Sequence, residues 1–181
     1  DELDWVRNDN DSGARLACNH LQQAGYKRII CIGSATSPQR QFKERYDGYA
    51  QYMRDVGQKP VLIAVEKGLP RAEQGRRAIE QLIATGQEFD GIFAVCDEIA
   101  LGAMTALREY GFDVPSQIGV VGFDGIRAGA HVTPSLTTIE PDFQAAGEML
   151  VGRILAVVMG KPHEKSRVPV RLLARGSTFR G

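Results

Sequence analysis

An aspartate stands at the end of the most apolar run of this chain, which reads I-G-V-V-G-F-D from Ile118 to Asp124. Uninterrupted β-branched and apolar residues are typical of a strand buried on both faces of a parallel sheet. Open α/β sheets bind ligands at the edge formed by the carboxyl ends of their strands. An ionised carboxylate only accepts hydrogen bonds, so Asp124 can hold sugar hydroxyls or ring N–H groups there. The alternative role for Asp124 is to cap a short turn or helix over Gly125–Gly129.

Arg45 is the second candidate, in the segment K-E-R-Y-D-G-Y early in a helical pattern. A guanidinium offers its donors in a fixed fork, so one arginine can hold two sugar hydroxyls or one acidic group. The alternative is a solvated helix arginine that pairs with Glu44 or Asp47.

Cys96 and Asp97 end another buried run, G-I-F-A-V-C-D. Asp97 is a favoured residue type for capping the helix predicted to follow it at Glu98, and contact with a ligand is the alternative. Cys18, Cys31 and Cys96 are an odd number without C-x-x-C spacing, which argues against a disulfide framework and a zinc site. We expect small buried side chains and a reducing, cytoplasmic environment.

Signatures of catalysis are missing from the sequence. It contains no G-x-G-x-x-G after a strand, no Walker loop and no G-x-S-x-G, and its histidines, His20, His131 and His163, are scattered. We therefore expect a binding protein without a cofactor or metal, and not an enzyme.

The charge is balanced, with 22 basic and 22 acidic residues. This excludes the electrostatic footprint of a nucleic-acid-binding or membrane-surface segment. No apolar run approaches the roughly 20 residues that span a bilayer.

Strand-like and helical patterns alternate along the chain, which predicts an α/β fold with a doubly wound parallel sheet and right-handed crossovers. A broad apolar stripe then predicts a helix from Pro141 to about Met159, and Val168–Ala174 is predicted as a last strand. The alternating strands are expected at Arg28–Gly33, Val61–Val65, Phe89–Val95 and Ile118–Gly122, and the helices at Asp11–Ala24, Arg40–Val56, Arg71–Thr85 and Glu98–Tyr110.

Several short motifs occur in an order that resembles the effector-binding domain of the lactose-repressor/galactose-repressor (LacI/GalR) family of bacterial transcription regulators. The matching residues are D-N-x-x-G (Asp9, Asn10, Gly13), H-L-x-x-x-G (His20, Leu21, Gly25), R-x-x-G-[YF] (Arg45, Gly48, Tyr49), D-E-I-A-L-G-A (Asp97–Ala103), V-G-[FY]-D (Val121–Asp124), L-T-T-I (Leu136–Ile139) and R-G-S-T (Arg175–Thr178). The resemblance implies a Rossmann-like lobe of a two-lobed, periplasmic-binding-protein-like type I fold.

In that family three segments cross between the lobes, and they match the chain entering near Asp9, a crossover at Leu136–Glu140 and a return at Lys161–Val168. The resemblance thus predicts that residues 1–139 form the second lobe, 140–162 a crossover and a helix of the first lobe, and 163–181 the return strand. We expect a fragment that lacks the DNA-binding headpiece and most of the first lobe.

The resemblance also implies a set of effector-contacting residues. Arg45 and Asp124 match contact positions, Phe143 matches an aromatic that stacks on the effector, and Asn8 matches a ligand-facing position. Cys96 stands where relatives often have Asn, Ser or Gly, which puts a polar contact there in doubt.

The implied function is the sensing domain of a cytoplasmic DNA-binding regulator. A sugar, a sugar acid or, less expectedly, a purine would close the lobes, and DNA would be bound only through an N-terminal headpiece outside this chain. The alternative is a periplasmic sugar-binding protein of a transporter. The family also implies a homodimer, with Ala100, Leu101, Met104, His131 and Val132 at the interface, and no membrane partner.

Overall fold

A computed structural model describes residues 5–162 and 164–179, so His163 lies outside the described residues. Its body is a six-stranded sheet of order β3-β2-β4-β5-β6-β8, in which the first five strands are parallel and β8 runs antiparallel to β6. These strands are β2 (Ile29–Gly33), β3 (Leu62–Ala64), β4 (Gly91–Ala94), β5 (Gly119–Phe123), β6 (Thr137–Pro141) and β8 (Val170–Leu173).

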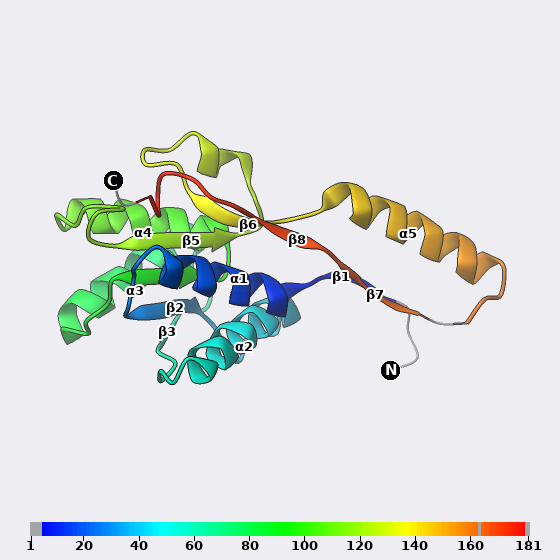
Figure 1. Cartoon of the computed structure of the whole chain (residues 1–181), viewed down its shortest axis with the longest axis horizontal. Helices are drawn as coiled ribbons and strands as arrows, with labels where there is room; N and C mark the ends of the chain where they lie inside the picture. The colour runs from blue at the N-terminus through cyan, green and yellow to red at the C-terminus, as the bar shows by residue number, and fades with distance from the viewer. Residues whose placement is uncertain (1–4, 163, 180–181) are drawn as a thin grey trace.

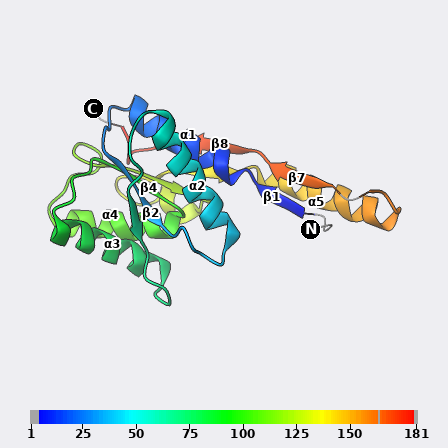
Figure 2. The same cartoon turned by 90° about the horizontal axis from the view of Figure 1, so that it is seen from below.

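Two pairs of helices cover the two faces of this sheet (Figures 1 and 2). α1 (Asn10–Gln23) packs beside α2 (Arg40–Asp55), and α3 (Arg71–Thr85) packs beside α4 (Asp97–Glu109). The predicted doubly wound α/β architecture is confirmed, and the bounds of these four helices lie within one residue of those predicted.

The core explains why the central strands are apolar throughout. Every residue of β2, β4 and β5 is buried, because helices cover both faces of the sheet. Glycines permit the closest helix contact, since a Cβ at Gly102 of α4 would collide with the backbone of Ala72 on α3. The motif D-E-I-A-L-G-A is thus partly a helix-packing motif.

A separate arm extends from the body (Figure 1). It consists of α5 (Phe143–Val158) and a two-stranded parallel sheet of β1 (Trp5–Asn8) and β7 (Lys165–Val168), both of which contact α5. No residue of α5 is buried, and its exposed apolar side chains include Leu150, Val151 and Ile154. The stripe on this helix is therefore not covered by the described residues.

One segment differs from its prediction, and one unpredicted strand precedes the last strand. The Leu136–Glu140 segment, expected as a crossover, is mostly the inner strand β6, which leaves the sheet only after Pro141. The strand expected at Val168–Ala174 is confirmed as β8, and β7 precedes it, separated from it by Pro169. Proline cannot donate to a sheet ladder, so pairing switches there from β1 to β6. Among the described helices, none combines the length and hydropathy needed to cross a membrane.

Candidate functional site

A hollow of about 450 Å³ lies at the carboxyl edge of the sheet, where β1 passes into α1. This effector-side hollow is lined by Val6, Arg7, Asn8, Asn10, Arg40, Gln41, Glu44, Arg45 and Asp124. The structure therefore brings together three of the predicted ligand residues, Asn8, Arg45 and Asp124, from β1, α2 and the end of β5.

Arg45 is held by three different oxygens although it is only 2% exposed. Its Nε donates to Asn10 Oδ1 at 2.9 Å, its Nη1 donates to the carbonyl oxygen of Val95 at 2.7 Å, and its Nη2 pairs with Asp124 Oδ1 at 2.9 Å. The guanidinium carbon also lies 3.7 Å from the ring centroid of Phe123. Burial lowers the pKa of Arg45, and the adjacent Asp124 carboxylate opposes that effect.

These three bonds use three of the five N–H donors of the guanidinium and leave two donors that they do not engage. The alternative pairings expected for Arg45 were wrong. Glu44 binds Arg40 and Asn10 instead, and Asp47 pairs with Lys43. The arginine is therefore fixed in position before any ligand arrives.

Asp124 has a backbone conformation that is rare for a side-chain-bearing residue. Its φ is 115°, and it is the non-glycine residue with positive φ in the part of the chain that the structure describes. Such conformations cost on the order of 1–3 kcal/mol and persist only where neighbours enforce them. Here the amide of Asp124 donates to the Ile139 carbonyl at 2.8 Å, and the Gly125 amide donates to Thr138 Oγ1 at 3.3 Å.

The carboxylate of Asp124 faces the hollow as well as Arg45, and its side chain is 38% exposed. Burial raises its pKa, while the charge and hydrogen bond of Arg45 offset part of that rise. The expected capping role was wrong, because the short helix η1 (Arg127–Ala130) has Ile126 at its N-cap and no side-chain cap. Asp124 is thus available to accept hydrogen bonds from a ligand.

Asp97 stabilises the segment that follows Asp124. The prediction that it caps α4 was wrong, because α4 starts at Asp97 itself and Cys96 occupies the N-cap. The carboxylate is fully buried and accepts from the Ile126 amide at 2.8 Å and the Thr138 hydroxyl at 2.6 Å. Burial raises the pKa of Asp97, and these hydrogen bonds counteract it.

Asn10 is a site residue that the sequence reasoning did not assign. It is 2% exposed, and its side chain links two residues of α2 by accepting from Arg45 and donating to Glu44 at 2.8 Å. The D-N-x-x-G motif, which contains Asn10, is the sequence feature that could have identified it as a site residue. A buried asparagine at the first position of a helix needs partners for its amide, and a nearby charged helix supplies them.

Two other predicted ligand residues lie outside the lining of the hollow. Cys96 is 3% exposed, and burial raises the pKa of its thiol to about 11, so the thiol stays protonated near neutral pH. Phe143 begins α5 on the arm and is 64% exposed. Contact of either with an effector stays a prediction.

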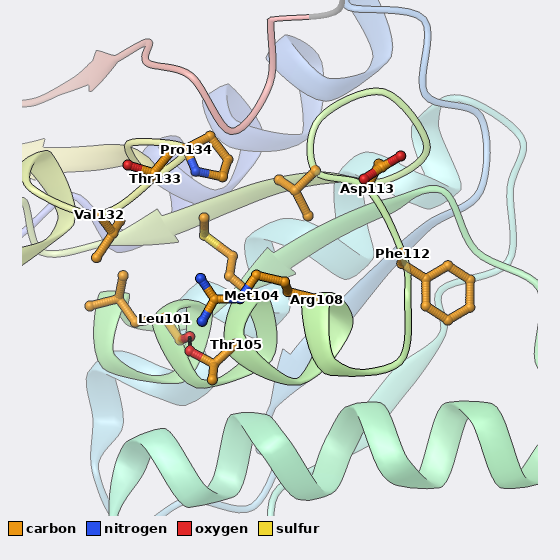
Figure 3. Close-up of a pocket in the computed structure, with 10 residues that line it drawn as sticks. Leu101, Met104, Thr105, Arg108, Phe112, Asp113, Val132, Thr133 and Pro134 are labelled. Atoms are coloured by element: carbon orange, nitrogen blue, oxygen red, sulfur yellow. Dashed lines mark hydrogen bonds between the residues drawn. The ribbon is translucent and has the colours of Figure 1, made fainter.

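A second, larger hollow of about 490 Å³ lies along α4 and shares no lining residue with the effector-side hollow. Leu101 and Met104 on α4 point toward Val132 and Pro134 on the loop after η1 (Figure 3). This α4 groove contains three of the residues predicted for the dimer interface. Of the other two, His131 is exposed beside the groove and Ala100 is buried in the core of its own chain.

Among the described residues, no group of three or more His, Cys, Asp or Glu side chains is arranged to hold a metal ion. The three cysteines are free and buried, as expected for small core side chains. The geometry of the effector-side hollow therefore favours reversible binding of a small polar molecule by a fixed guanidinium and a carboxylate.

Residues 18–178 match the family model described as the periplasmic binding protein-like domain. The ribose operon repressor of Halalkalibacterium halodurans is 30% identical over the whole of this chain. The chain spans 54% of that repressor's length, so it matches about half of the relative.

Solved structures agree with this match. The lac repressor dimer bound to operator and the anti-inducer ONPF superposes with a TM-score of 0.87 and 28% identity, over 97% of this chain and 52% of that one. A LacI family transcriptional regulator from Enterococcus faecium with bound ribose gives a TM-score of 0.83 and 26% identity, over 97% and 65% of the two chains.

Proposed function

Because the chain belongs to the periplasmic binding protein-like domain family, with LacI/GalR-family regulators as its relatives, we propose that it is the effector-sensing part of a DNA-binding transcription regulator. In this proposal a small sugar or sugar acid binds between two lobes, of which this chain supplies one body and a helix of the other. The relatives are regulators, which favours this function over the binding protein of a transporter. Such a regulator would act in the cytoplasm and would not be an enzyme.

The observation that carries the proposal is the buried Arg45 paired with Asp124 at the carboxyl edge of the sheet. A donor and an acceptor fixed 2.9 Å apart can bind neighbouring hydroxyls of one sugar ring, each according to its own polarity. The position agrees with the rule for ligand sites in open α/β sheets. The related Enterococcus faecium regulator carries bound ribose, which supports a carbohydrate ligand here.

In this proposal the arm belongs to the lobe that moves relative to the body. We assign residues 1–139 largely to the second lobe, 140–162 to the crossover and a first-lobe helix, and 163–181 to the return. β1 differs from this division, because it pairs with β7 on the arm and the body begins near Asp9. A ligand that contacts both the arm and the body favours the closed arrangement by its difference in affinity for the two states.

The α4 groove supports a homodimer. Leu101, Met104 and Val132 contribute apolar side chains to this groove, and a related repressor was solved as a dimer on its operator. Under this proposal, closure of the lobes in the dimer changes the spacing of two DNA-binding headpieces that lie outside this chain.

Calorimetric titration of the full-length protein with a panel of sugars and sugar acids tests the site. We expect the Arg45→Ala protein to lose at least about tenfold in affinity, because it removes a charge-assisted contact and leaves Asp124 unpaired. Arg108→Ala, in the α4 groove, is the matched control and should bind normally. Equal binding by the Arg45→Ala and wild-type proteins would overturn the assignment.

A further inference from the structure

The charges around the effector-side hollow do not balance. Three arginines and two carboxylates line it. Two of the arginines have a carboxylate partner, since Arg40 Nε lies 2.8 Å from Glu44 and Arg45 Nη2 lies 2.9 Å from Asp124. The remaining arginine, Arg7, carries the excess positive charge of the site.

Arg7 has no anionic partner among the described residues. Its Nη1 is a buried nitrogen without a hydrogen-bond acceptor in the part of the chain that the structure describes. Its guanidinium carbon lies 4.4 Å from the ring centroid of Trp5, its neighbour two positions back on β1. Stacking on an aromatic face holds a guanidinium in place but leaves its in-plane N–H groups unbonded.

The charge of Arg7 reaches the hollow. The pKa of Glu44 is lowered although its burial acts to raise it, because Asn10 and Arg40 donate hydrogen bonds and because Arg40 and Arg7 add positive charge. Arg167 lies beside Arg7 in the parallel register of β1 and β7 and brings a second like charge, but Arg167 is paired with Asp9 at 3.1 Å. Arg7 alone of this pair lines the hollow.

A buried N–H of a charged group without an acceptor is costly, and an anion is the ligand that removes the cost most effectively. Hydroxyls alone would satisfy the bond but would not neutralise the excess charge. We propose that the effector is an anionic sugar whose carboxylate or phosphate is bound by Arg7, while Arg45 and Asp124 bind its hydroxyls. This inference rests on the proposed function and narrows its ligand class.

Matched ligand pairs test the inference on the full-length protein. Glucose, galactose and ribose would be titrated beside glucuronate, galacturonate, glucose 6-phosphate and ribose 5-phosphate, with wild type, Arg7→Gln, Arg7→Lys and Arg167→Gln. We expect a member of the anionic set to bind tighter than its neutral counterpart. Arg7→Gln should weaken that binding about tenfold or more, Arg7→Lys should restore part of it, and Arg167→Gln should change it less than about twofold.

Unchanged affinity of the Arg7→Gln protein for the bound anion, or tighter binding of neutral sugars, would overturn the inference. Neutral binding that still depends on Arg45 would leave the proposed function standing without it. No binding by any member of the panel would count against both. Preference for the carboxylates or for the phosphates tells which anionic group the site takes, and unfolding midpoints of all variants separate lost binding from lost folding.

Discussion

Asp97 and Asp124 lie on neighbouring strand ends, yet their surroundings give them different tasks. Asp124 presents one oxygen to Arg45 and is partly exposed to the hollow, whereas Asp97 is fully buried and binds the loop that follows Asp124. The sequence indicated both as carboxylates at the edge of the sheet. It could not indicate their partners, because the Ile126 amide and the Thr138 hydroxyl come from segments distant from Asp97 along the chain.

Replacing Asp97 tests its supporting role. Asp97→Ala should lower the free energy of unfolding by about 2 kcal/mol or more, because the Ile126 amide and Thr138 hydroxyl lose their buried acceptor. Asp97→Asn should cost less, since its amide oxygen can accept from Ile126 and its NH₂ can donate to a reoriented Thr138 hydroxyl. Urea unfolding of the full-length protein measures both, and equal losses would show that these bonds do not support the loop.

The contribution of Asp97 to stability should change with pH in a defined direction. Burial raises the folded-state pKa of Asp97 above the ordinary value of 3.8, so the folded protein holds this proton more tightly than the unfolded chain does. The associated stability is present below pH 3.8 and is lost as the pH rises through the raised pKa. The stability of wild type relative to Asp97→Asn should therefore fall as the pH rises from about 3.8 through the raised pKa. A rise over that window would contradict the burial argument.

Among the elements, hydrophobic periodicity predicted the four helices of the body and the strands β2, β3, β4 and β5 well, because these helices are long and these strands are uniformly apolar. It missed β1 and β7, whose sequences W-V-R-N and K-S-R-V carry charges and resemble loops. It also missed that β6 belongs to the sheet. Its buried Thr137 and Thr138 are polar, and they are satisfied by contacts with Arg175 and Asp97 that no local pattern indicates.

The exposed apolar face of α5 leads to a prediction at this scale. In a preparation of these 181 residues alone, Leu150, Val151 and Ile154 are uncovered and should drive concentration-dependent association. Replacing Leu150 and Ile154 by serine should abolish that association with little loss of stability, because neither side chain is buried. Sedimentation velocity over a range of concentrations would measure it. A wild-type fragment that stays monomeric, or a double variant that is strongly destabilised, would contradict the view that this face of α5 is a surface that another lobe covers.

Across the whole molecule, two separate hollows are proposed to serve two separate functions, the effector-side hollow near Arg45 and the α4 groove. The groove is the larger of the two, and its lining mixes apolar side chains with two threonines, one arginine and one aspartate. The sequence contains the residues that line both hollows. It does not show which of these residues lie together or how large each hollow is.

Leu101→Arg tests the groove as a dimer surface. A charge in place of the apolar Leu101 side chain should dissociate a homodimer formed through this groove, whereas Arg40→Ala at the effector-side hollow should not. Light scattering of the full-length proteins gives the mass directly. A Leu101→Arg protein that keeps the wild-type mass would exclude this surface as the interface.

Hydrogen exchange of the full-length protein, with and without the ligand found by titration, is the decisive test of the proposed site. We predict slower exchange on binding in peptides that cover Asp124–Ile126 and the first turns of α2 around Arg45, and unchanged exchange at Leu101–Arg108. Protection confined to Leu101–Arg108, with the Asp124 loop unaffected, would contradict the claim that the buried Arg45 and Asp124 pair forms the effector site.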